Sequence, residues 1–108
     1  MNPQVKQKWI DALRSGEYEQ AKFTLKCEYG YCCLGVLTDL YIQENDLEWV
    51  YDNKSNNYEF DGNEGSLCNY VIKWSDFPDG KVEEELIKMN DTTLKTFSEI
   101  ADYIEENL

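Results

Sequence analysis

Cys33-Leu34-Gly35-Val36-Leu37-Thr38-Asp39-Leu40-Tyr41 is the stretch that decides the fold of this 108-residue chain. From Cys33 its apolar residues recur at i, i+3, i+4, i+7 and i+8, which is the spacing of one face of an α-helix. Leu34 adds apolar surface on a second face, so we predict a buried helix at the centre of the fold. Gly35 inside it costs about 1 kcal/mol relative to alanine, which indicates that another backbone packs closely there.

A second helix is predicted upstream, over residues 3–15. Asn2 suits its N-cap, Pro3 its first turn and Gly16 the position after its end. Arg14 falls in the last turn, where its charge faces the negative end of the helix dipole. The core face of this helix would consist of Val5, Trp9, Ala12 and Leu13.

Alternating apolar residues predict strands on both sides of the central helix. A short strand is expected over residues 23–27, and a hairpin with a longer loop over residues 47–51 and 58–60. After the hairpin, Ser66 is expected to cap a third helix. The apolar face of that helix would consist of Leu67, Tyr70, Val71 and Trp74.

The C-terminal third adds at least one more helix. Residues 82–89 have helical propensity but form a short segment, and the sequence leaves their structure open. Thr96 and Glu99 form a capping box for a last helix. Its buried stripe would be Phe97, Ile100, Ala101 and Ile104. The pattern predicts a small single α+β domain over residues 1–108, with three to four helices packed on a short antiparallel sheet or hairpin.

Net charge limits the classes of partner. The chain has 22 acidic and 10 basic residues and a formal charge of −12. Such a field repels nucleic acid and anionic membranes, so neither is expected as a partner. No apolar stretch approaches the ~20 residues that span a bilayer, and no secretory signal is recognised at the start. We therefore expect a cytoplasmic protein.

The four cysteines are expected to be reduced in that compartment. Cys27, Cys32 and Cys33 lie close in sequence, whereas Cys68 follows after a gap of 34 residues. Only the first half of this spacing approaches that of a structural zinc site. Buried thiols that act as small apolar groups are the favoured interpretation. We expect no metal and no cofactor.

Catalytic motifs are scarce. The chain has no histidine, and therefore lacks the commonest general base and the usual activator of serine or cysteine nucleophiles. Asp61, Asn63 and Gly65 begin like an EF-hand loop, but Ile72 occupies the position where such a loop needs glutamate. We expect a protein that is not an enzyme.

Residues 14–22 are the segment that suggests a binding site. They contain the only arginine of the chain, and a strand with further lysines follows. Arginine and lysine bind phosphate, tyrosine stacks on bases, and glutamine reads their edges. An ordinary helix-to-strand turn is the alternative interpretation. The candidate ligand-binding residues are Arg14, Ser15, Tyr18, Gln20 and Lys22, with Tyr31 as a stacking partner.

Two signatures resemble a small, mostly bacteriophage-encoded protein family. They are Trp9-x-x-Ala12-Leu13-Arg14-Ser15-Gly16-x-Tyr18-x-Gln20 and Tyr31-Cys32-Cys33-Leu34-Gly35-Val36-Leu37, and a third likeness follows at 89–105. Ala21 stands where the family has glycine, and Met89 where it has leucine. The resemblance implies an accessory protein made during infection and acting in the host cytoplasm.

From this setting we predict a counter-defence protein that binds a host nucleotide second messenger, such as a cyclic nucleotide, and sequesters it without cleavage. Few cations per copy favour a homo-oligomer whose copies share the pocket. The alternative is an acidic inhibitor of a basic host protein, of which a DNA mimic is one form. Its working surface, here called the C-terminal acidic face, would be Glu83, Glu84, Glu85, Glu99, Asp102, Glu105 and Glu106.

Overall fold

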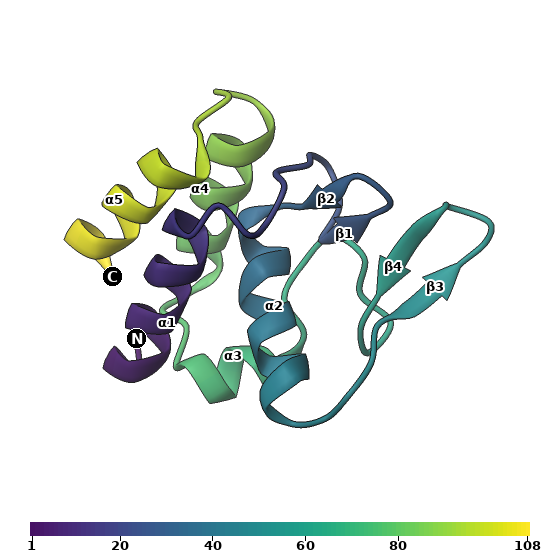
Figure 1. Cartoon of the computed structure of the whole chain (residues 1–108). Coiled ribbons are helices and arrows are strands. Elements are labelled where there is room, and N and C mark those ends of the chain that lie inside the picture. Colours follow the sequence, from purple (N-terminus) through teal and green to yellow (C-terminus); the bar gives the residue numbers. More distant parts are fainter.

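A computed structural model describes residues 1–108 as five helices and a four-stranded antiparallel sheet (Figure 1). The α+β class is therefore confirmed, with one helix more than expected. The helices are α1 (Pro3–Arg14), α2 (Cys33–Glu44), α3 (Asn69–Ser75), α4 (Gly80–Asp91) and α5 (Phe97–Asn107). The strands are β1 (Lys26–Cys27), β2 (Gly30–Tyr31), β3 (Val50–Asp52) and β4 (Asn57–Glu59).

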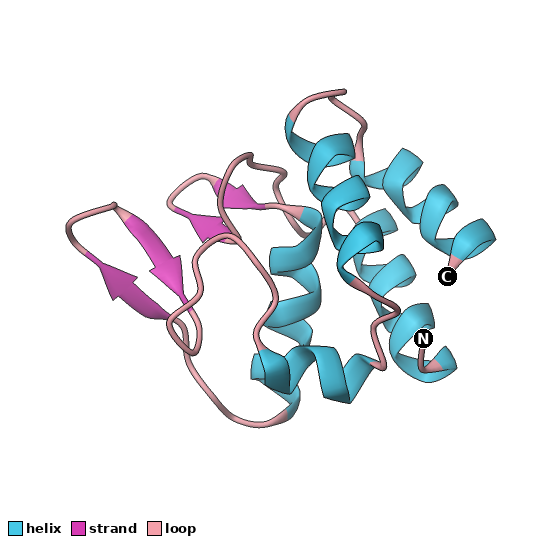
Figure 2. Cartoon of the chain, turned by 180° about the vertical axis from the view of Figure 1, so that it is seen from behind, coloured by secondary structure: helices cyan, strands magenta, loops and turns pink.

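The strands form one small sheet in the order β2-β1-β4-β3. Lys26 of β1 pairs with Tyr31 of β2 on one side and with Tyr58 of β4 on the other. Helices α1 and α5 lie side by side on one side of α2, and the β3–β4 hairpin projects on the other side (Figure 1). Seen from behind, the hairpin again stands clear of the helices (Figure 2).

The predicted central helix is confirmed as α2. Leu34, Val36 and Leu37 are completely buried, while Leu40 and Tyr41 near its end are half-buried. Both apolar faces of α2 are used because α1, α3 and α4 all contact it. The predicted stripes of α1 and α5 are likewise buried, apart from half-buried Ala12.

The backbone at Leu25, just before β1, crosses α2 at Gly35. A Cβ at this position would overlap the backbone carbonyl of Leu25. The same carbonyl accepts a hydrogen bond from the Cys32 amide at 3.1 Å. The close backbone approach predicted from Gly35 is therefore confirmed, and only glycine fits at the crossing.

Two local signals also behave as predicted. The Asn2 side chain accepts hydrogen bonds from the first turn of α1, and Gly16 follows that helix with φ +78°. Thr96 and Glu99 form both hydrogen bonds of the capping box. Residues 82–89, whose structure the sequence left open, belong to α4. Asp79 is the N-cap of this helix, and its carboxylate accepts a hydrogen bond from the Val82 amide at 3.0 Å.

The strand predicted over residues 23–27 is shorter in the structure. Phe23 has φ +66°, which is incompatible with an extended strand, so β1 contains only Lys26 and Cys27. The amide of Leu25, the residue before β1, donates to the carbonyl of Glu64 at 2.6 Å. The chain there is therefore bound to the loop that contains Glu64.

The prediction that Ser66 caps the third helix is wrong. Helix α3 begins at Asn69, with Cys68 in the N-cap position and no side-chain cap. The Ser66 hydroxyl instead contacts the Asn63 side chain at 3.4 Å. Tyr70, predicted to lie on the apolar face, is 59% exposed.

We predict that Gly35→Ala lowers the free energy of unfolding by about 3 kcal/mol or more, because the added methyl group forces α2 away from the Leu25 carbonyl. Urea denaturation followed by circular dichroism measures this change. Gly65→Ala is the matched control, because nothing lies within 4 Å of the added carbon there. Equal stability of the two variants would contradict the crossing.

Candidate functional site

The first two predicted site residues, Arg14 and Ser15, are engaged in internal contacts. The Arg14 guanidinium binds the carboxylates of Asp102 at 2.7 Å and Glu105 at 3.3 Å on α5. These hydrogen bonds, that of Glu105 foremost, raise the pKa of Arg14. The Ser15 hydroxyl donates to the Ala12 carbonyl at 2.7 Å and completes the end of α1. Arg14 therefore joins α1 to α5 and is not a free anion-binding group.

Gln20 joins its loop to the C-terminal helices. Its side-chain amide donates to Asn90 and to the Lys95 carbonyl, each at 2.9 Å. Its side-chain carbonyl accepts the Phe97 amide at 3.1 Å. Asn90, which is 1% exposed, also donates to the Ala21 carbonyl at 2.8 Å. With donors and acceptors satisfied in this way, Gln20 has a structural role that its place in the sequence does not reveal.

Tyr18 and Tyr31 are both predicted to contact the ligand. They do contact one another, but both are half-buried and packed against other residues of the chain. Their rings meet edge to face with centroids 5.0 Å apart. The Tyr18 hydroxyl donates to the buried carboxylate of Asp39 at 2.6 Å, and the Trp49 indole donates to the same carboxylate at 2.9 Å. Burial raises the pKa of Tyr18 and of Tyr31. No sequence pattern marks Asp39, because its partners Tyr18 and Trp49 lie outside its own helix.

Lys26 occupies the remaining face of this aromatic cluster. Its ammonium lies 4.5 Å from the ring centroid of Tyr58, 5.4 Å from that of Tyr31 and 5.6 Å from that of Trp49. Such cation–π contacts are favourable by about 0.5–2 kcal/mol. Lys26 lies over the half-buried Tyr31 ring and Tyr18 packs against it, so this ring is a poor stacking surface for a ligand base.

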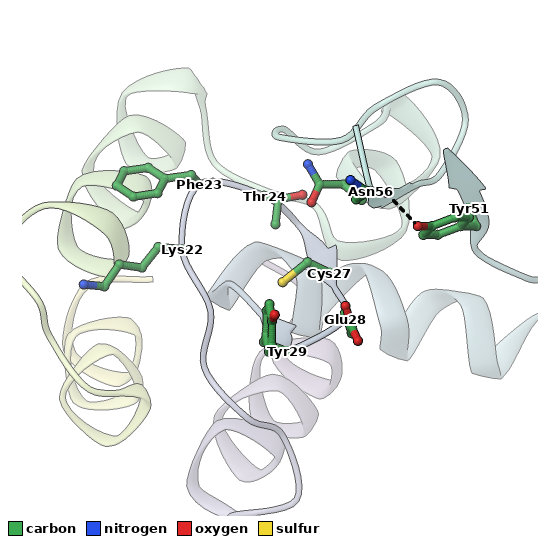
Figure 3. Close-up of a pocket in the computed structure, with 9 residues that line it drawn as sticks. Lys22, Phe23, Thr24, Cys27, Glu28, Tyr29, Tyr51 and Asn56 are labelled. Atoms are coloured by element: carbon green, nitrogen blue, oxygen red, sulfur yellow. Dashed lines mark hydrogen bonds between the residues drawn. The ribbon is translucent and has the colours of Figure 1, made fainter. Parts of the chain in front are cut away.

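Lys22 is the predicted residue that borders two open cavities, and Gln20 lines the smaller of them. The larger cavity has a volume of about 590 Å³, within the range of small-molecule sites (Figure 3). The side chains of Tyr29, Tyr51 and Asn56 come to it from different segments, and the Tyr51 hydroxyl donates to Asn56 at 3.0 Å. The lining residues are Lys22, Phe23, Thr24, Cys27, Glu28, Tyr29, Tyr51, Asn56 and Asn57.

The rings around this cavity are unusually exposed. Phe23 is 76% exposed, Tyr29 79% and Tyr51 52%. Phe23 also holds a left-handed backbone conformation, which costs a residue other than glycine about 1–2 kcal/mol. Its amide donates to the Asp91 carboxylate at 3.1 Å, which fixes this conformation. An exposed and strained phenylalanine contributes little to a core, and strain of this kind is concentrated at functional sites.

A smaller cavity of about 250 Å³ adjoins Lys22 on its other side. Lys95 and Leu94 line it, and Leu94, like Phe23, is an exposed apolar residue with positive φ. The Lys22 ammonium points away from Tyr29 and Cys27 (Figure 3). Lys22 therefore separates a cavity with aromatic rings from one bordered by two lysines.

Comparison with known proteins identifies the family. The profile described as a domain of unknown function (DUF8296) matches residues 1–108. The chain belongs to the DUF8296 family. No curated protein and no solved structure matches it. In this DUF8296 protein no helix has the length and apolar character needed to cross a membrane.

Three carboxylates gather beside the β3–β4 hairpin. Ligand atoms of Asp52, Glu59 and Glu64 lie within 4.8 Å of one another. Oxygen groups at this spacing are of the kind that Ca²⁺ or Mg²⁺ uses. Half-buried acidic groups of this kind are also common in acidic proteins that bind no ion, so the geometry alone does not make a metal site. Asp61 and Asn63, which resembled an EF-hand, are not among them.

The cysteines of this DUF8296 protein divide by burial. All four are free thiols, and Cys32, Cys33 and Cys68 are buried. Burial raises the pKa of Cys32 to about 11 and that of Cys33 well above its usual value. Cys27 is half-buried and lines the larger cavity, which makes it a chemical reporter of that site.

We predict that one thiol per native chain reacts rapidly with a disulfide reagent at pH 8, and that four react in denaturant. Cys27 is the only cysteine that is not buried, and only thiolates react. The absorbance of the released chromophore measures the stoichiometry. Cys27→Ser should abolish the rapid phase, and a rapid phase that persists in this variant would contradict the assignment.

Proposed function

We propose that the protein binds a small anionic ligand with an aromatic ring, of the nucleotide class, and sequesters it without conversion. The observation that supports this most is the set of exposed rings at the larger cavity, namely Phe23, Tyr29 and Tyr51. Base stacking on such rings is favourable by about 1–3 kcal/mol per base. The side chains of Asn56 and Asn57 add hydrogen-bonding groups for the edge of a base.

The distribution of charge narrows the ligand class. Lys22 and Lys95 line the smaller cavity together, in a chain with a net charge of −12. The Lys95 ammonium lies 3.7 Å from Glu99 in an exposed ion pair, which is weak enough to yield to a phosphate. Glu28 on the larger cavity disfavours a highly charged ligand. A cyclic nucleotide has one negative charge per phosphate and suits this balance.

Binding without turnover is proposed because the chain lacks histidine and none of its hydrogen bonds joins Cys27 to a base. The resemblance to phage proteins supplies the setting. In it the protein acts in the host cytoplasm as an accessory counter-defence protein that withholds a nucleotide signal from a host immune response. A homo-oligomer would bring lysines from a second copy to the ligand.

The C-terminal acidic face supports the rival function less well. Four of its seven carboxylates already have internal partners. Asp102 and Glu105 bind Arg14, Glu99 closes the capping box, and Glu83 accepts the Leu67 amide at 2.8 Å. Only Glu84, Glu85 and Glu106 remain without such a partner. Three carboxylates are few to mimic the phosphates of a DNA backbone.

We predict that a cyclic nucleotide raises the melting temperature of the protein. At a ligand concentration 100-fold above Kd, the free energy of unfolding rises by about 2.7 kcal/mol, which corresponds to roughly 10–20 °C for a domain of this size. Thermal-shift assays with cyclic di-AMP, cyclic di-GMP, cyclic oligonucleotides and cyclic ADP-ribose isomers measure this rise. Chromatography of the released ligand should return it intact.

Matched tyrosine variants locate the site in the same assay. Tyr29→Ala should abolish most of the rise in melting temperature. Tyr70→Ala removes another exposed tyrosine, one that does not line the larger cavity, and should leave the rise unchanged. The absence of any shift at saturating nucleotide refutes the proposal. If both variants retain the rise in melting temperature, the ligand binds at a site other than the larger cavity.

A pair of substitutions at Phe23 separates strain from binding. We predict that Phe23→Gly is more stable to urea than Phe23→Ala by about 1 kcal/mol, because only glycine adopts the left-handed conformation without cost. Both variants should lose nucleotide affinity, because both lack the ring. Equal stability of the two variants would show that the conformation at Phe23 stores no strain.

A further inference from the structure

The outer edge of β3 is open, whereas the opposite edge of the sheet is covered. At the covered edge the amide of Ala21 donates to the Tyr31 carbonyl at 2.7 Å, and the amide of Tyr31 donates to the Glu19 carbonyl at 2.9 Å. β3 pairs with β4 alone and forms the outer edge of the sheet, away from β1 and β2 (Figures 1 and 2). Its outward peptide groups are therefore free to pair with another strand.

An apolar groove runs beside this open edge. It has a volume of about 380 Å³, and its apolar walls are Tyr41, Leu47, Val50, Phe60 and Tyr70. Val50 is 56% exposed and Leu47 43%, although both are aliphatic. Exposed apolar surface gathered in one depression is typical of an interaction site. A side chain from a strand added to β3 would lie next to Val50 and could enter the groove.

The surroundings of the groove are acidic. Residues 44–64 contain seven carboxylates and one lysine, Lys54. Glu48 and Asp61 line the groove, and the carboxylate cluster of Asp52, Glu59 and Glu64 lies on the same hairpin. None of these five acidic residues forms an ion pair with a lysine or arginine. This uncompensated charge attracts a basic partner and repels a second copy of the same surface.

We propose that β3 and its groove bind an extended, basic segment of a partner protein as a fifth strand of the sheet. Backbone hydrogen bonds to β3 supply affinity, and an apolar side chain of the added strand fills the groove beside Val50. Val50, Asp52 and Glu59 lie on one face of the hairpin, so basic side chains two positions away from the apolar one point to that same face and reach Glu48, Asp61 and the carboxylate cluster. The groove shares no lining residue with the larger cavity, although Tyr51 of β3 lines that cavity from the other face of the strand. The peptide assay contains no nucleotide, so its result is independent of the proposed function.

The probe is a labelled nine-residue peptide with valine at its central position, lysine at the other odd positions and threonine at the even positions, so that valine and lysine point to one face of the strand. Fluorescence anisotropy measures its binding. A second peptide has the same sequence and charge but carries N-methyl groups at alternate positions, so that one edge cannot donate hydrogen bonds. We expect the methylated peptide to bind at least tenfold more weakly. Equal affinity of the two peptides would mean that charge alone attracts them, and would overturn the proposal.

Two variants with the same change of charge locate the binding site. Val50→Lys should weaken binding of the unmethylated peptide at least tenfold, while Leu94→Lys, at another exposed apolar residue, should weaken it far less. Circular dichroism confirms that each variant is folded. Equal effects of the two variants refute the assignment to β3. Light scattering that finds a dimer lost in Val50→Lys, together with no peptide binding, identifies a second copy as the occupant and also overturns the proposal.

Discussion

The fold depends on the contact of the Leu25 carbonyl with the first turn of α2. Gly35 gives the carbonyl room, and the Cys32 amide donates to it. Two other elements attach at the same turn. The Trp9 indole of α1 donates to the Cys33 carbonyl at 2.9 Å, and Asn90 of α4 accepts the Cys33 amide at 3.3 Å. The first turn of α2 therefore fixes α1, α4 and the segment leading into the sheet.

This constraint also shapes the candidate site. The segment between α1 and β1 is held at Gln20 by the C-terminal helices and at Leu25 by α2. Lys22 and Phe23 lie between these two anchors, and the chain must turn there over a short distance. The left-handed conformation of Phe23, fixed by Asp91, is a consequence of that turn. An exposed ring and an exposed ammonium are thereby presented beside a cavity.

Sequence patterns predicted what depends on neighbours in the chain. Helical spacing predicted α1, α2 and α5, and Gly35 correctly indicated a close backbone crossing. The prediction at Ser66 was wrong because a serine before an apolar run also suits a loop, where its hydroxyl contacts Asn63. The sequence indicates Arg14 as an anion-binding group but does not reveal that carboxylates of α5 already bind it. These partners lie about 90 positions away, beyond the reach of any local pattern. Asp39 has nearer partners, Tyr18 and Trp49, but they lie in loops outside its helix, so no helical spacing relates them to it.

The central claim is that the ligand site lies at the cavity beside Lys22 and not at the end of α1. Correlation spectra of the ¹⁵N-labelled protein, recorded during titration with cyclic nucleotides, test it most directly. The account predicts shifts of amide signals from residues 22–29 and 51–57, with the signals of Arg14 and Ser15 unmoved. Shifts confined to residues 14–18, or no shifts with any nucleotide at saturation, would contradict it.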